Sequence, residues 1–396
     1  MKVLLSGGGT GGHVYPAIAI ADKIKENHPD AEIMFVGTQN GIESQLVPNN
    51  GYEIKTITIQ GFKRKIDLEN GKRVITLCKG LNEASKIIKE FKPDLVIGTG
   101  GYVSAPILFI SSVNKNITTI IHEQNSFPGV TNKILSTTVS KVLTSFDESH
   151  KRFPSTAKDK LYLTGNPVRK EILNTNKETA RETLNTSPDK KMVLCYGGSG
   201  GSRKINDSMV KLVKDMLNND LAFIFATGKN FYDSFMQNFE NINFNEYQRI
   251  VPYLNDMPNA LAACDVVITS AGAISLAEIT AKGKPCVIIP KAYTAENHQE
   301  YNAKSIEKEN AGVCILEKDL TDKLLSNTVL DLLDDNERLI TMSNNSKNIG
   351  NVDAIDCIYE QIMESYNLNN KNKDTSSKNK DLSINIKPIK IKKKTR

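Results

Sequence analysis

The sequence predicts an α/β protein made of two doubly wound, Rossmann-like domains, each built around a parallel sheet. Three glycine-rich clusters support this prediction, because residues 6–13, 98–106 and 197–202 each follow a short apolar run. Each cluster indicates a strand, a tight turn and a helix, a geometry in which backbone N–H groups approach phosphate at a positively polarised helix N-terminus. Because such turns lie in both halves of the chain, we expect two domains that face one nucleotide ligand across a cleft.

The first half of the chain alternates strand-like and helix-like segments. Continuous apolar runs are typical of buried parallel strands, and here they cover residues 2–6, 33–37, 94–98, 118–123 and 141–145. Helices are expected between these runs. Pro16 stands where a first helical turn begins, and Ile18, Ala21 and Ile24 follow at helical spacing.

The pattern restarts after Gly165 and predicts a second doubly wound domain. Its apolar runs cover residues 192–197, 221–228, 265–270, 286–290 and 313–316. We therefore expect a first domain over 1–166, a second over 167–350, a C-terminal helix over 351–366 that could pack on either domain, and a disordered tail over 367–396. A glycine turn by itself also serves tight strand-to-helix packing without any ligand, so both interpretations stay open for each cluster.

Composition narrows the class of protein. The 396 residues are 39% apolar and 24% charged, an ordinary composition for a chain with two buried cores. No run approaches the roughly 20 apolar residues of a membrane-spanning helix. Because the chain opens directly on a strand, we expect no signal peptide and a cytoplasmic location. The six cysteines show no C-x-x-C pair, and we interpret them as reduced core residues.

The net charge of +6 belongs to the tail, since residues 367–396 carry +8 and the first 366 residues carry −2. The tail is rich in Asn, Lys and Ser and ends in IKPIKIKKKTR. It could be a solvated terminus, a segment that adheres to an anionic membrane, or a nucleic-acid arm. The slightly acidic remainder has no recognisable nucleic-acid-binding motif, so we expect no nucleic acid partner.

Eight short motifs follow one another along the chain. They are GGTGGH (8–13), GGYVSAP (100–106), HEQN (122–125), GNPVR (165–169), GGSGGS (197–202), the DM of YLNDM (253–257), SAGAISLAE (270–278) and NHQEYNA (297–303). In this order they resemble the MurG family of GT-B glycosyltransferases. The resemblance implies transfer of N-acetylglucosamine from UDP-N-acetylglucosamine to lipid I, forming lipid II in peptidoglycan synthesis, with inversion at the anomeric carbon. It extends to about residue 366 and leaves the tail without a role.

Displacement of UDP builds negative charge on the diphosphate, which cations, backbone N–H groups or a metal must stabilise. The chain contains no D-x-D pair, so we expect neither a metal nor a cofactor. The resemblance implies that the turn at 197–201, Ser199 and Arg169 hold the diphosphate. Taken alone, an arginine such as Arg169 more often forms a surface or hinge salt bridge, and its place in GNPVR favours the diphosphate instead.

The resemblance assigns the other donor contacts residue by residue. Glu278 would accept both ribose hydroxyls, although it could also be only a carboxylate at a helix N-terminus. The further positions that it assigns to UDP-N-acetylglucosamine are Thr10, Gly11, Gly12, Asn125, Leu254, Ala273, Ile274, Ser275, Leu276, Ala277 and Gln299. One departure from the family is Gly200, which removes a side-chain contact that many members have in the third turn.

His13 is our first candidate for the base that takes a proton from the acceptor hydroxyl. It ends the first glycine turn, and imidazole titrates near neutral pH. A buried structural histidine is the alternative. Glu123 is the second candidate base, and it could instead orient His13 or its own loop.

The acceptor carries a long polyprenyl chain, so the resemblance implies a peripheral enzyme on the cytoplasmic side of the membrane. Residues 58–73 mix apolar and basic side chains in a way that suits an anionic inner membrane surface. A loop with solvated lysines fits the same composition. Three other functions stay open: a related glycolipid glycosyltransferase, a non-catalytic UDP-sugar-binding scaffold, and a nicotinamide-dependent oxidoreductase. The G-x-G-x-x-G pattern and acidic residue of such an oxidoreductase fit poorly here.

Overall fold

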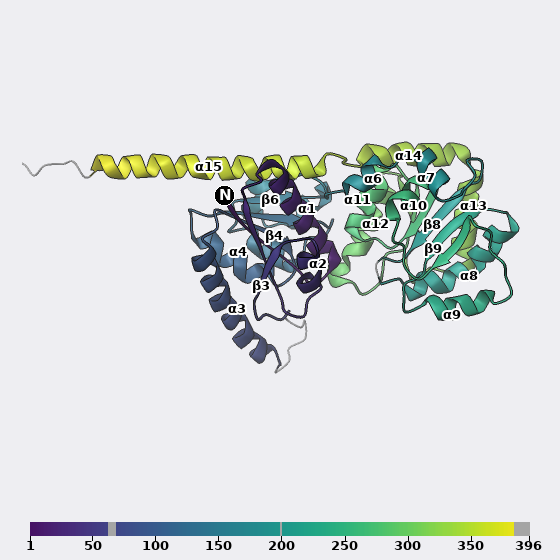
Figure 1. Cartoon of the computed structure of the whole chain (residues 1–396), viewed down its shortest axis with the longest axis horizontal. Coiled ribbons are helices and arrows are strands. Elements are labelled where there is room, and N and C mark those ends of the chain that lie inside the picture. The colour runs from purple at the N-terminus through teal and green to yellow at the C-terminus, as the bar shows by residue number, and fades with distance from the viewer. Residues whose placement is uncertain (62–68, 199, 384–396) are drawn as a thin grey trace, which may run out of the picture.

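The computed structural model describes residues 1–61, 69–198 and 200–383, with the backbone alone at 69–72, 295 and 373–383. Two domains lie side by side, each with a parallel sheet covered by helices on both faces (Figure 1). The prediction of two doubly wound α/β domains is confirmed. The first strand of each domain is third in its sheet, and the strand order reverses beside it.

The first domain contains a seven-stranded sheet of order β3-β2-β1-β4-β5-β6-β7. Its strands are β1 (Lys2–Gly7), β2 (Glu32–Gly37), β3 (Glu53–Thr56), β4 (Leu95–Gly100), β5 (Thr118–Glu123), β6 (Lys141–Thr144) and β7 (Leu161–Leu163). Its helices are α1 (Gly11–Asn27), α2 (Glu43–Asn49), α3 (Glu69–Phe91), α4 (Ser104–Val113), α5 (Val130–Leu135) and the short 3₁₀ turns η1 (Asp147–Arg152) and η2 (Ser155–Lys160).

The second domain contains a six-stranded sheet of order β10-β9-β8-β11-β12-β13. Its strands are β8 (Met192–Tyr196), β9 (Ala222–Ala226), β10 (Gln248–Val251), β11 (Val266–Thr269), β12 (Cys286–Ile288) and β13 (Gly312–Cys314). Its helices are α6 (Lys170–Asn174), α7 (Lys177–Thr183), α8 (Arg203–Asn218), α9 (Tyr232–Met236), α10 (Met257–Ala263), α11 (Ala273–Ala281), α12 (His298–Lys308), α13 (Asp322–Asp334) and α14 (Asn336–Ile349), with η3 (Gln237–Phe239) and η4 (Ala295–Asn297).

The last helix, α15 (Ala354–Ser383), leaves the second domain and packs on the first (Figure 1). Ile358 and Ile362 are fully buried in the first domain's core beside α1. We expected a helix only to residue 366 and a disordered segment after it, but α15 continues to Ser383. The physical reason is that no glycine or proline interrupts residues 354–383.

The chain crosses between the domains twice, and the two crossings touch. The first runs from β7 to α6, and the second from α14 to α15. Asn351 in the second crossing donates its side-chain N–H to the carbonyl of Thr164 in the first, at 2.9 Å. A side chain on Gly165 would meet Asn351 and Ala354 at about 3 Å, so the two crossings are in contact over several residues.

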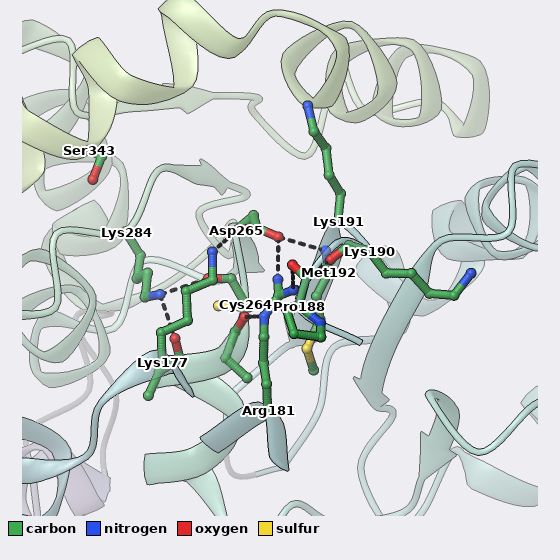
Figure 2. A network of polar contacts seen from close by, with 12 residues as sticks. Lys177, Arg181, Pro188, Lys190, Lys191, Met192, Cys264, Asp265, Lys284 and Ser343 are labelled. Carbon is green, nitrogen blue, oxygen red and sulfur yellow. Dashed lines mark hydrogen bonds and ion pairs between the residues drawn. The ribbon is translucent and has the colours of Figure 1, made fainter. Parts of the chain in front are cut away.

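The buried side chain of Arg181 connects several loops at the amino ends of the strands of the second sheet, opposite the third glycine turn (Figure 2). Arg181 of α7 donates to the carbonyls of Ala263, Ser187, Pro188 and Lys190 and to the carboxylate of Asp265. The same carboxylate also accepts hydrogen bonds from Lys177 Nζ and from the backbone N–H of Met192. Because Arg181 is only 3% exposed, these bonds satisfy a charge that burial would otherwise penalise.

The six cysteines are free thiols. Cys195, Cys264 and Cys286 are buried in the second domain, as expected of reduced core residues. The expectation is wrong for Cys78, which lies exposed on α3, because the apolar run around it is one face of a surface helix.

Candidate active site

The three glycine turns connect strand to helix as the sequence predicts. The first two join β1 to α1 and β4 to α4 in neighbouring strands, and they contact each other through Gly8 N–H and the carbonyl of Gly100 at 3.3 Å. The third joins β8 to α8 in the second domain. There Gly201 has a φ of +76°, and a side chain on it would lie 2.2 Å from the carbonyl of Thr227. This glycine is therefore required by packing, in addition to any ligand.

His13 stands in the first turn of α1, directly after Thr10, Gly11 and Gly12. Its Nδ1 lies 2.9 Å from the carbonyl oxygen of Gly8, and 3.4 Å from the hydroxyl of Thr10. A carbonyl only accepts, so this contact assigns the proton to Nδ1 and leaves the lone pair of neutral imidazole on Nε2. His13 is half-buried at the carboxyl end of the first sheet.

Glu123 ends β5 and is 2% exposed. One carboxylate oxygen accepts the backbone and side-chain N–H groups of Asn125 at 3.0 and 3.2 Å. The other accepts Gly129 N–H at 3.0 Å and the Asn132 amide at 2.8 Å. Four donors from its own loop surround this carboxylate, and no hydrogen bond links it to His13 in the part of the chain described.

Asn302 of the second domain binds Asn125 and Ser126 of the first domain. Asn302 of α12 is fully buried, and its amide donates to Asn125 Oδ1 and to the carbonyl of Ala271, both at 3.1 Å. Its Oδ1 accepts Ser126 N–H at 2.8 Å. One side chain therefore links the loop after β5 to the loop before α11.

Arg169 and Glu278 bind each other. Arg169 Nε and Nη2 donate to the two carboxylate oxygens of Glu278 at 2.6 and 3.1 Å. The Glu278 side chain is 7% exposed and the Arg169 side chain 50% exposed. The resemblance implies that these two residues hold neighbouring parts of one nucleotide, and the structure brings them together across 109 positions of the chain.

Glu278 is the sixth residue of α11, and the helix begins five residues before it at Ala273. The first helical hydrogen bond runs from Leu276 N–H to the carbonyl of Gly272, so the amides of Ala273, Ile274 and Ser275 have no partner within the helix. Ala277 and Leu254 pack against the core of the second domain. Ser199 lies outside the described residues.

Lys291 is a residue that the sequence analysis missed. Its Nζ donates to the carbonyl of Gly201 at 2.8 Å, and it lies 4.0 Å from the position of a side chain on Gly198. Its backbone N–H donates to Gln299 Oε1 at 2.9 Å. This bond links Gln299, a predicted contact of the donor sugar, to the loop of Lys291. Burial lowers the pKa of Lys291, and the charge of Glu317 partly opposes this. A single lysine outside any motif gives no local signal of this position.

The fold and the site define a class, a glycosyltransferase of GT-B architecture. The models of the glycosyltransferase family 28 N-terminal and C-terminal domains match residues 3–144 and 192–358. The fold is also similar to the crystal structure of Acinetobacter baumannii MurG, with a TM-score of 0.74 at 23% identity over 92% of this chain and 99% of that one.

Two curated relatives place the chain more narrowly. It is 68% identical over 371 residues to the UDP-N-acetylglucosamine–N-acetylmuramyl-(pentapeptide) pyrophosphoryl-undecaprenol N-acetylglucosamine transferase of Clostridioides difficile, covering 94% of this chain and 90% of that protein. It is 46% identical to the protein of the same name from Alkaliphilus metalliredigens, covering 92% and 99%. The chain belongs to glycosyltransferase family 28 and, within it, to the MurG family.

His122, at the start of the HEQN motif, is a buried titratable group of the first domain. It is fully buried, with Nε2 3.0 Å from the carbonyl of Gly165 and Nδ1 3.0 Å from the Gln124 amide. Burial lowers the pKa of His122, although the Gly165 bond and the charge of Glu123 oppose this. The neutral ring is therefore the form that the folded protein favours.

We predict that stability decreases as the pH falls below about 6.5, the usual pKa of an unfolded histidine. Below that pH the unfolded chain binds a proton that folded His122 resists, so folding loses at most about 1.4 kcal/mol per pH unit. Urea unfolding at pH 7.5, 6.5 and 5.5 measures this slope. His122→Gln should flatten it, and equal slopes in both proteins would contradict the assignment.

Proposed function

We propose that this protein transfers N-acetylglucosamine from UDP-N-acetylglucosamine to the muramoyl 4-hydroxyl of lipid I, forming lipid II with inversion at the anomeric carbon. The observation that carries the proposal is the 68% identity to an N-acetylglucosamine transferase over nearly the whole chain, because a GT-B fold alone hosts many chemistries. The arrangement of the candidate residues supports it in three ways.

First, the second domain offers positive charge where a diphosphate would sit. Arg169 binds the side chain of Glu278 in α11, Lys291 donates to the carbonyl of Gly201 just before α8, and backbone N–H groups are available at the start of α11. These groups would stabilise the charge that develops as UDP leaves. The Arg169–Glu278 pair suits a nucleotide, since its ribose and diphosphate are adjacent. Glu278 would then share its carboxylate between the guanidinium and the ribose hydroxyls.

Second, the first domain offers a base. With the proton held on Nδ1, His13 can take the acceptor's hydroxyl proton at Nε2 while the oxygen attacks the anomeric carbon and the bond to UDP breaks. Glu123 is better suited to hold the loop of Asn125, because four donors already occupy it. Asn125 and Gln299 would then address the sugar, and Leu254 the uracil. Thr10, Gly11 and Gly12, at the start of α1, would also contact UDP-N-acetylglucosamine.

Third, the first domain exposes apolar side chains on helices that pack together. Phe109 and Val113 of α4 are 48% and 73% exposed, Ile134 of α5 is 65% exposed, and Ile75 of α3 is 71% exposed. Helix α4 packs against both α3 and α5. We call the surface formed by these four residues the α3–α5 patch, and propose that it docks on an anionic membrane where the acceptor is anchored. Of the docking segment that the sequence predicts at 58–73, residues 62–68 lie outside the described residues.

Within the described residues, no helix combines the length and the apolar character needed to cross a bilayer. We propose that the protein attaches peripherally at the cytoplasmic face through the α3–α5 patch.

The function is tested with radiolabelled UDP-N-acetylglucosamine and a lipid I analogue, with and without a chelator. We expect transfer to continue in the chelator, since Arg169, Lys291 and helix N-termini supply the positive charge. Strict dependence on added Mg²⁺ would overturn the metal-free scheme. Calorimetric titration with UDP-N-acetylglucosamine separates the alternative functions. A non-catalytic scaffold would bind this compound without transferring the sugar, and an unrelated enzyme such as an oxidoreductase would not bind it.

The role of Lys291 is tested by Lys291→Ala. Loss of a charge-assisted contact to phosphate should raise the KM for UDP-N-acetylglucosamine about tenfold, with a smaller effect on kcat. Lys304→Ala is the matched control, because Lys304 is an exposed lysine of α12 paired with Glu300. A Lys291→Ala variant with the KM of the control would exclude this contact.

Membrane docking is tested by flotation with vesicles that contain anionic lipid. The double variant Val113→Glu, Ile134→Glu should bind these vesicles at least about tenfold more weakly, because two carboxylates would replace apolar contact and repel the surface. Ile340→Glu, at a site 62% exposed in the second domain, is the control. Equal binding by all three proteins would show that the α3–α5 patch is not the docking surface.

A further inference from the structure

A buried carboxylate supports the first glycine turn from behind. Glu43 opens α2 and is 1% exposed. One of its oxygens accepts Gly9 N–H at 3.0 Å, and the other accepts the backbone N–H and the hydroxyl of Thr38 at 2.9 and 2.7 Å. No motif of the sequence analysis included this residue.

The glycines around Glu43 leave room for its side chain. A side chain built on Gly8, Gly37 or Gly41 would approach the Glu43 side chain to between 2.2 and 2.8 Å. Gly8 in the first glycine turn, Gly37 at the end of β2 and Gly41 in the loop after it thus face one carboxylate. This packing places the carboxylate directly against the backbone of the turn that precedes His13.

One peptide group connects Glu43 to His13. Gly9 N–H and the Gly8 carbonyl belong to the same peptide bond, whose N–H donates to Glu43 and whose oxygen accepts from His13 Nδ1 at 2.9 Å. We propose that Glu43 is a positioning residue that acts on His13 through the Gly8–Gly9 peptide, holding the imidazole proton on Nδ1 and stabilising the imidazolium that forms during transfer. This inference rests on the proposed function, in which His13 Nε2 is the base.

Physical chemistry supports a connection of this kind. Hydrogen bonds in a chain polarise one another, so a carboxylate on the N–H makes the carbonyl of the same peptide a stronger acceptor. The stronger acceptor favours Nδ1–H over the tautomer that a free imidazole side chain prefers. When Nε2 takes the acceptor's proton, the polarised peptide faces the new positive charge, as a carboxylate does in a Ser-His-Asp triad.

Glu43 is suited to this role because it is ionised. Burial raises the pKa of Glu43, but the hydrogen bonds from Gly9 and Thr38 outweigh it and leave that pKa below its usual value. The ring of His13 is held from its other side by the second glycine turn. A side chain on Gly100, whose φ is +111°, would lie 2.9 Å from His13 Cδ2 and 3.0 Å from Nε2.

The test compares wild type, Glu43→Gln, Thr38→Val and His13→Gln in the full-length protein. Glu43→Gln keeps the shape but removes the charge. Thr38→Val is the matched control, since it removes one bond to the far carboxylate oxygen and leaves the Gly9 contact. Transfer kinetics give kcat and the KM for UDP-N-acetylglucosamine, and ¹⁵N NMR of labelled histidine gives the tautomer of His13.

We expect neutral His13 to carry its proton on Nδ1 in wild type and Thr38→Val. In Glu43→Gln the other tautomer should become populated, and kcat should fall about tenfold with KM within about twofold, a part of the roughly 10²–10⁴-fold that general base catalysis contributes. His13→Gln should set the lower limit of kcat.

Three results would overturn the proposal. The first is an Nε2–H tautomer in wild type, a measurement that holds even if Glu43→Gln does not fold. The second is a Glu43→Gln variant with wild-type tautomer and kcat. The third is an equal loss of kcat in Thr38→Val, which would mean that Glu43 only supports local structure. Absence of transfer by wild type with an Nδ1–H tautomer would instead count against the proposed function, so the two failures are distinguishable.

Discussion

The candidate site depends on one constraint, the parallel direction of every strand in both sheets. Parallel strands send all the loops that follow them to one edge, and the helices after those loops begin there with unpaired backbone N–H groups. The first domain places His13 at such an edge, and the second places the third glycine turn and α11 there. The backbone N–H groups alone therefore favour anion binding at the carboxyl ends of the strands in both domains. A few side chains there, such as His13, add the specific contacts of the candidate site.

The sequence predicts the central strands well and the outer strands poorly. Ten apolar runs correspond to strands, with ends that differ by a few residues. The strands that it missed, β3, β7 and β10, lie at sheet edges, where one side is open. β3 and β7 contain mostly exposed or half-buried residues, so no continuous apolar run marks them. Helix α15 was underestimated for a related reason, since its apolar spacing stops near Tyr366 although nothing in the chain ends the helix there.

Site residues in glycine-rich motifs were predictable because local sequence determines where they stand. His13 and Glu278 each lie in the helix that follows a strand and a turn, His13 in the first turn of α1 and Glu278 as the sixth residue of α11. Contacts between distant residues were not predictable. The Arg169–Glu278 pair, the approach of Lys291 to Gly201 and the contact of Glu43 with Gly9 depend on how separate loops pack. For Glu43, Gly37 and Gly41 beside it are a weak local signal that becomes clear only with the fold in view.

The two contacting crossings between the domains have a mechanical consequence. Asn351 joins them at Thr164, and α15 anchors the second crossing in the first domain's core. Because the two crossings lie side by side, we expect relative motion of the domains to be mainly a rotation about one axis through them, with twisting and sliding restrained. A proteolytic cut in either crossing would leave the lobes joined by the other, so the pair also protects the molecule against separation into halves.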